Sequence, residues 1–158
     1  MKLTRLIFLF TIAGLMITAL FTTQSLAKQS DNNMLLAQVY QRGIDVNQYL
    51  VSEKYDGVRA VWDGSIFHTR TGRVIAAPTW FTKGLPKMQL DGELWLGHGK
   101  FDALSGAVRK AVPVEEEWRG ISYLIFELPE ALGTFAARVQ RINDIVKVAN
   151  VPHLKAVT

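Results

Sequence analysis

The stretch VSEKYDGVRAVWDG, residues 51–64, decides the fold class because it joins strand-like runs through glycine turns. Residues 49–54 and 58–62 lie on either side of Tyr55-Asp56-Gly57, and we predict that they form two strands separated by this turn. Asp63-Gly64 is a typical hairpin dipeptide, and residues 65–70 predict the next strand. The stretch therefore indicates antiparallel strands connected by tight turns.

Helices and strands alternate along the rest of the chain. Residues 79–85 and 101–111 predict helices, whereas residues 88–97 and 121–128 predict strands. A final helix is predicted by apolar residues that recur at i, i+4, i+7 and i+11 from Phe135. Hairpin-connected strands with interspersed helices predict an antiparallel α+β domain.

The first 27 residues have the pattern of a cleavable signal peptide. A basic start precedes an uncharged run from Leu6 to Phe21, and Ser25-Leu26-Ala27 supplies the small-x-small exit. The alternative is an uncleaved membrane anchor, since the run is about as long as a short spanning helix. We expect cleavage, a domain in residues 28–158, and a periplasmic or secreted location.

The composition after cleavage is mildly basic and lacks cysteine. The 18 basic residues include Lys2 and Arg5, and 14 residues are acidic, so the charge without the signal peptide is +2. This balance alone does not indicate a nucleic-acid partner. The absence of cysteine excludes disulfides, thiol catalysis and cysteine-type zinc sites. The three histidines show no metal-ligand spacing.

Lys54 is the candidate nucleophile in the opening stretch. In an extended segment it projects to the same side as Asp56, and Gly57 permits a tight turn or close approach to a ligand. A lysine amine attacks only after it loses its proton, which burial or nearby positive charge promotes. Arg59 is placed to supply that charge or to bind a phosphate. The alternative is an ordinary exposed turn.

Four further residues carry possible chemistry. Arg70 ends a predicted strand, where its guanidinium can reach a ribose or phosphate oxygen, or simply be exposed. Asp91 and Glu93 share the polar face of one predicted strand, so both can line a cleft or form a solvated edge. Phe126 is either a core residue or an aromatic face for a purine.

The order of these residues resembles the nucleotidyltransferase domain of ATP-dependent DNA ligases. The motifs are K-x-D-G-x-R from Lys54 to Arg59, T-R-T-G around Arg70, D-G-E ending at Glu93, and F-E-L starting at Phe126. With the signal-like start and the compact spacing, residues 36–158 look like the small exported ligases of Gram-negative bacteria, the ligase-E type.

The resemblance implies an α+β, antiparallel-sheet nucleotidyltransferase domain, that is, an ATP-grasp-like adenylation domain. Lys54 would attack the α-phosphate of ATP, form lysyl-AMP and release pyrophosphate. The AMP would then activate the 5′-phosphate of nicked double-stranded DNA for attack by the 3′-hydroxyl. Mg²⁺ is implied because this transfer builds charge on phosphate oxygens.

The resemblance also implies a set of nucleotide-binding residues: Ser52, Glu53, Asp56, Arg59, Arg70, Glu93 and Phe126. Arg59 would contact phosphate, while Arg70 and Glu93 would lie near the ribose. Glu93 would in addition assist the metal. Phe126 would stack on adenine, and the backbone around Ser52 and Glu53 would read the amino edge of the base.

The chain departs from the family pattern at its end. Glu127 occupies a position where the family more often has aspartate. An E-G metal-site motif, a K-x-K motif and an OB-fold would follow in the family, but Lys147 and Lys155 are not spaced as K-x-K. We therefore expect an N-terminal part of the adenylation domain, incomplete at the C-terminus, without an OB-fold, and inactive or impaired in ligation.

Two other functions stay open. An RNA ligase or another covalent nucleotidyltransferase would share these motifs, although a signal peptide argues against a capping enzyme. A non-catalytic nucleotide- or DNA-binding remnant is the other. For the leading hypothesis we expect a monomer without a stable protein partner and without membrane association after cleavage. DNA contacts would be mostly to phosphate, with Arg109, Lys110 and Arg119 as contributors.

Overall fold

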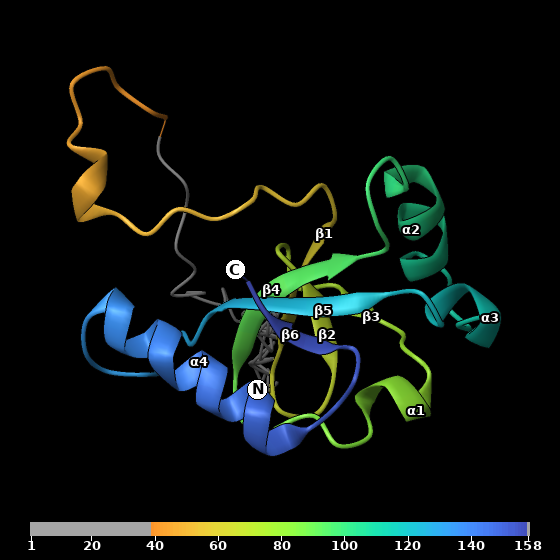
Figure 1. Ribbon diagram of the computed structural model, residues 1–158. Coiled ribbons are helices and arrows are strands. Elements are labelled where there is room, and N and C mark those ends of the chain that lie inside the picture. The colour runs from red at the N-terminus through yellow and green to blue at the C-terminus, as the bar shows by residue number, and fades with distance from the viewer. Residues whose placement is uncertain (1–38, 158) are drawn as a thin grey trace, which may run out of the picture.

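The computed structural model describes residues 39–157, and the predicted signal peptide lies outside them. Six strands form one sheet in the order β3-β2-β1-β4-β5-β6 (Figure 1). The strands are β1 Val58–Trp62, β2 Phe67–Thr69, β3 Val74–Ile75, β4 Leu90–Trp95, β5 Ser122–Glu127 and β6 Leu154–Ala156. Every pair is antiparallel except β5–β6, which is parallel. The predicted α+β class with a mainly antiparallel sheet is confirmed.

Helices contribute one apolar core on a single face of this sheet. They are η1 Val46–Gln48, α1 Thr79–Thr82, α2 Phe101–Val108, α3 Glu115–Trp118 and α4 Phe135–Ala149. Buried side chains from α1 to α4 join one cluster with the sheet residues Ala60, Leu94 and Tyr123. Register places those three residues on the same face, because cross-strand partners share a face. The polar residues of β1 and β4 therefore lie on the opposite face.

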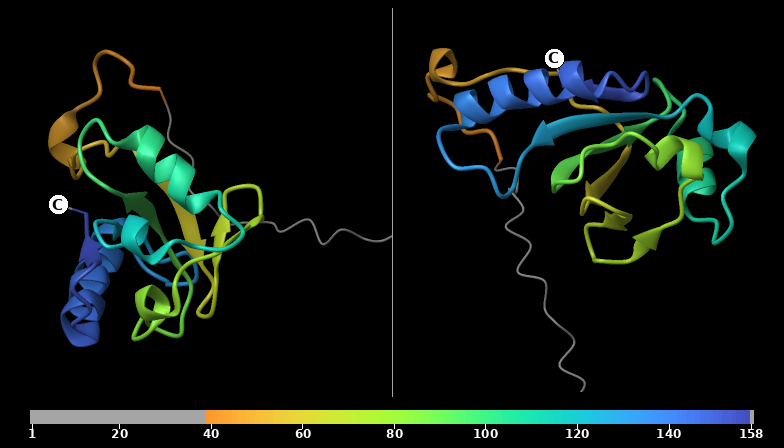
Figure 2. Two further views of the ribbon diagram at one scale, coloured as in Figure 1. Left: turned by 90° about the vertical axis from the view of Figure 1, so that its right-hand side faces the viewer. Right: turned by 90° about the horizontal axis from the view of Figure 1, so that it is seen from below.

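Helix α4 is fastened to the sheet by a charged pair. It packs along β5 and β6 (Figures 1 and 2). Arg138 donates from Nε and Nη2 to the buried Glu127 carboxylate at 2.6 and 2.8 Å. Burial alone would raise the pKa of Glu127, but Arg138 and the Leu128 N–H outweigh it and hold that pKa below its ordinary value. Thr134 caps the first turn by accepting from the Ala137 N–H.

One predicted strand is wrong. Residues 49–54 pair with no strand among residues 39–157, and they run as an exposed segment that extends away from the sheet before β1 (Figure 1). Their apolar members stay uncovered: Leu50 is 61% exposed and Val51 is 83% exposed. The strand prediction fails because a strand also needs a partner edge, and composition alone does not supply one.

The other predicted elements are confirmed, and the missed ones are short. The first helix and the first strand after residue 57 match α1 and β1, and the final helix matches α4. β3, β6 and α3 were not predicted, because two to four residues do not contain a readable period. Within residues 39–157, no helix is both long and apolar enough to cross a membrane.

Candidate nucleotide site

A buried ion pair lies at the centre of the polar face. Arg59 on β1 donates from Nε to Asp91 Oδ1 at 3.1 Å and from Nη2 to Oδ2 at 2.6 Å. Asp91 is fully buried, whereas Arg59 keeps 21% of its side chain exposed. The Arg59 guanidinium also lies 5.1 Å from the centre of the Phe126 ring. This two-point pairing fixes the plane of the guanidinium beside the aromatic face.

Glu93 lies next to this pair and accepts a hydrogen bond from the Gly57 N–H. It is paired across the strands with Arg59. Burial raises the pKa of Glu93 to about 7, against the opposing positive charges of Arg59 and Lys54. At neutral pH this carboxyl group is therefore divided between its protonated and charged forms, so it can either donate or accept a proton.

Gly57 permits this arrangement because a side chain there has no room. A Cβ at residue 57 would lie 2.3 Å from the Leu94 carbonyl oxygen and 2.7 Å from Glu93 Cγ. Only glycine lets the backbone after Lys54 approach β4 this closely. The glycine of the K-x-D-G motif is thus required by contact with β4, whereas the sequence indicated a tight turn or a close approach to a ligand.

Lys54 is exposed, and the residues on either side of it contact Trp95 at the end of β4 and His98 in the loop that follows. The Tyr55 ring packs edge-on against Trp95, with ring centres 5.1 Å apart. The Oε1 atom of Glu53 lies 3.4 Å from Nε2 of His98. These contacts place the Lys54 backbone beside Glu93, and the charge of Lys54 acts on that carboxyl group. Trp95 and His98 were not among the predicted site residues, since pairing with an irregular segment leaves no sequence pattern.

An apolar groove lies next to the Lys54 segment. Its volume is about 360 Å³, within the range typical of small-molecule sites. It is lined by Leu50, Val51, Ser52, Ile125, Phe126, Phe135, Val139, Ile142, Asn143, Ala156 and Val157. The groove brings Ser52 and Phe126 together from segments far apart in sequence, between α4 and the residues that precede Lys54. An apolar slot with an aromatic wall can hold a flat heterocycle.

Two predicted residues lie at the margin of this site. Arg70 is exposed in the turn after β2. Extending the β1–β2 register one step past the Ala60–Thr69 pair places Arg70 opposite Arg59. Asp56 is exposed, and no hydrogen bond or ion pair to it is found within residues 39–157. Their predicted contacts with nucleotide stay predictions.

Glu93 is a candidate metal ligand among the acidic residues of this site. Asp91 is paired with Arg59, whereas the charge of Lys54 acts on Glu93. In the described part of the chain, no three histidine or acidic side chains are grouped to hold a metal. Mg²⁺ is commonly held by one or two carboxylates together with substrate phosphates, so Glu93 fits as one ligand beside a nucleotide.

Comparison with known proteins reveals similarity in both sequence and fold. A DNA ligase of Haemophilus influenzae is 29% identical over 124 residues, which are 78% of this chain and 45% of that protein. A solved structure from a structure-function analysis of DNA binding by Lig E DNA ligases matches with a TM-score of 0.73 and 34% identity. The chain resembles Lig E DNA ligases. No protein-family model matches the sequence.

The similarity confirms the resemblance inferred from the ligase motifs, and it extends to the fold. The match to the solved Lig E structure covers 78% of this chain and 49% of that one. The chain thus spans about half the length of the ligases that it matches. Activity of a complete ligase is therefore a proposal for this chain.

Proposed function

We propose that Lys54 is the nucleophile of an ATP-dependent DNA ligase adenylation domain located in residues 28–158. One observation carries the proposal: the charge of Lys54 acts on a partly buried acid, Glu93, while Ser52, two residues before it, lines an apolar groove with an aromatic wall. A nucleophile, an ionisable partner and a base-sized slot thus lie near one another beside strands β4 and β5. The similarity to DNA ligases supports the same assignment.

The groove would bind adenine, with Phe126 stacked on the ring and the backbone near Ser52 and Glu53 at its amino edge. That orientation would direct the phosphates toward Lys54. The lysine nitrogen would then bond to the α-phosphorus as the bond to the β-phosphate oxygen breaks, releasing pyrophosphate and forming lysyl-AMP. Holding the reactants in line supplies much of such an acceleration. Mg²⁺, when bound, would offset charge on the phosphate oxygens.

Arg59, Glu93 and Arg70 would position the nucleotide sugar and phosphate. The pairing with Asp91 fixes the Arg59 guanidinium before ligand arrives, so little conformational entropy is lost on binding. Its exposed portion would contact phosphate. Glu93 would accept a ribose hydroxyl and provide the metal ligand, with Arg70 approaching the same sugar. Asp56, which is exposed, would contact the nucleotide from the solvent side.

The AMP would next be transferred to the 5′-phosphate of nicked double-stranded DNA, after which the neighbouring 3′-hydroxyl would seal the nick. We expect this chain to be impaired in sealing, because residues 131–158 lack a K-x-K pair. A signal peptide in residues 1–27 would deliver the protein, as a monomer, to the periplasm or the exterior.

Intact mass measurement of the chain after incubation with ATP and Mg²⁺ tests this function. We expect a gain of one AMP in the unaltered chain and none in Lys54→Ala. Lys87→Ala is a matched control, because Lys87 is exposed outside the site. An AMP adduct that persists in Lys54→Ala would contradict the assignment. Adduct formation with NAD⁺ in place of ATP would overturn the choice of nucleotide.

Substrate choice is tested separately with a nicked duplex. We expect AMP to pass from the charged chain to a 5′-phosphate at a DNA nick, with little or no sealing. Transfer only to nicked RNA would favour the RNA ligase alternative. Efficient sealing by this chain alone would contradict the predicted impairment.

A further inference from the structure

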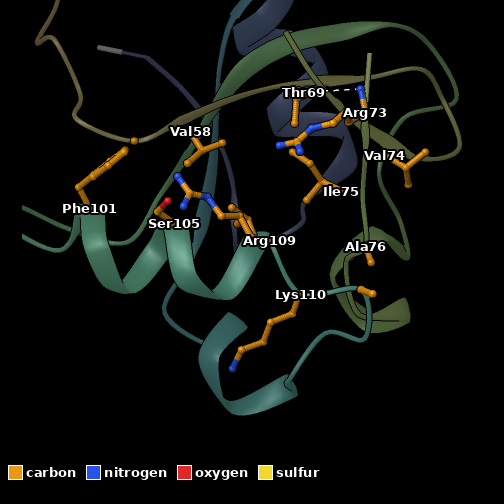
Figure 3. Close-up of a pocket in the computed structure, with 13 residues that line it drawn as sticks. Val58, Thr69, Arg73, Val74, Ile75, Ala76, Phe101, Ser105, Arg109 and Lys110 are labelled. Carbon is orange, nitrogen blue, oxygen red and sulfur yellow. Dashed lines mark hydrogen bonds between the residues drawn. The ribbon is translucent and has the colours of Figure 1, made fainter. Parts of the chain in front are cut away.

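A second pocket lies beside Gly57 and Val58. It occupies about 890 Å³ between the β2–β3 hairpin and α2 (Figure 3). Gly57 and Val58 form one wall, next to residues of the hairpin and of α2. This pocket is separate from the apolar groove at Phe126, because the two share no lining residue.

The charges that line this pocket all have one sign. Arg73, Arg109 and Lys110 contribute to the lining, and no acidic residue does. Lys110 turns away and is paired with Glu117 at 2.6 Å. Arg73 extends over the pocket from the hairpin, whereas Arg109 rises from the end of α2 beside Ser105 (Figure 3). Among residues 39–157, neither arginine has an ion pair with a carboxylate.

We infer that Arg73 and Arg109 bind the phosphate backbone of duplex DNA in this pocket. The inference rests on the proposed function, because it assigns the second substrate of the same reaction. Two uncompensated guanidinium groups on opposite walls match a phosphodiester, which each can contact through a planar pair of N–H donors. The ATP phosphates would lie on the Glu93 side, so the same backbone segment would separate the nucleotide from the DNA.

A purely structural explanation for Arg109 also exists. It ends α2, where a positive charge favours the negative end of the helix dipole. Arg73 has no such role, since it lies in the hairpin that precedes β3. The two explanations therefore differ in what Arg73 does. Loss of DNA affinity on substitution of Arg73 alone cannot result from weakening α2.

Fluorescence anisotropy of a labelled, nicked DNA duplex measures this contact. The full chain and the variants Arg73→Gln, Arg109→Gln and their double variant would be titrated at several NaCl concentrations. We expect about fivefold weaker binding for each variant at 0.15 M salt and about thirtyfold for the double variant. The slope of log affinity against log salt should fall by about one for each arginine. Glutamine preserves most of each side chain's apolar stem.

A matched control removes the same charge elsewhere. Lys87→Gln with Lys147→Gln alters two exposed cations outside the pocket and should leave the affinity within about twofold. Equal losses in the control and pocket double variants would overturn the inference, as would unchanged affinity in Arg73→Gln. Circular dichroism would verify that each variant is folded.

The inference and the proposed function fail in different ways. AMP capture by the unaltered chain needs no DNA and reports on Lys54. The anisotropy of the labelled duplex reports on the pocket that Arg73 and Arg109 line, the arginine pocket. Pyrophosphate serves as a competitor. If it displaces DNA only from the unaltered chain and leaves the residual binding of the double variant intact, the arginines hold phosphate as inferred. Displacement to the same extent from both proteins would contradict this.

Discussion

The Arg59–Asp91 pair shows what a single residue contributes to this site. Asp91 is completely buried and depends on one guanidinium for its charge to be tolerated there. The pair joins neighbouring strands β1 and β4, and its arginine also lies against Phe126. Asp91 therefore stabilises the fold and fixes the orientation of a residue proposed to contact phosphate.

Asp91→Asn should lower the free energy of unfolding by about 3 kcal/mol, because it removes one partner of a buried pair. Glu117→Gln is the matched control, since the exposed pair with Lys110 should contribute no more than about 1 kcal/mol. Urea unfolding followed by tryptophan fluorescence measures both. Equal effects in the two variants would show that the Arg59–Asp91 pair does not stabilise the protein.

Sequence patterns identified this pair only in part. Alternation placed Asp91 and Glu93 on one polar face, and the sheet confirms that assignment. The pairing of Arg59 with Asp91 was not predicted, because it depends on the register between two strands and joins residues that are 32 positions apart. The same limit applies to the segment before Lys54, whose contacts with Trp95 and His98 arise only in three dimensions.

At the scale of elements, β4 and β5 approach closely at Gly92. A Cβ there would lie 2.4 Å from the Leu124 carbonyl oxygen and 2.7 Å from the Tyr123 ring. The register between the two strands shifts at this point, between Asp91 and Gly92. The glycine of the D-G-E motif is therefore needed for strand packing, and it indirectly positions the acids on either side.

Gly92→Ala should destabilise the protein by about 3 kcal/mol, because the strands must separate or shift to admit a methyl group. Gly106→Ala provides the control: this glycine lies within α2, and a methyl group added to it would meet no neighbouring atom within 4 Å. Alanine there should stabilise the helix by up to about 1 kcal/mol. The midpoints of thermal unfolding should therefore move in opposite directions, and a shared direction would contradict the packing argument.

At the scale of the whole molecule, His153 joins distant parts of the chain. Its Nε2 lies 2.6 Å from the Phe81 carbonyl oxygen, and its ring stacks on Phe81 with centres 4.2 Å apart. Burial lowers the pKa of His153, although the hydrogen bond to Phe81 acts in the opposite direction. The unfolded chain therefore takes up this proton more readily than the folded one.

The stabilising contribution of neutral His153 should be complete above the unfolded histidine pKa of about 6.5 and lost as the pH falls below it. Urea unfolding at pH 7.5 and 5.5 should show a larger loss of stability in the unaltered chain than in His153→Gln. His98→Gln is the control, because His98 is 77% exposed. If His153→Gln retains the full pH dependence, another group is responsible.

Gly57 lies between the two proposed binding sites. Its N–H bonds to Glu93 on one side, and its backbone lines the arginine pocket on the other. Under the proposed scheme, only the thickness of a polypeptide backbone would divide the two reactants. The acceptor phosphate would then lie near the lysyl-AMP without a domain having to carry AMP across the protein, and changes at residue 57 would disturb both half-reactions together.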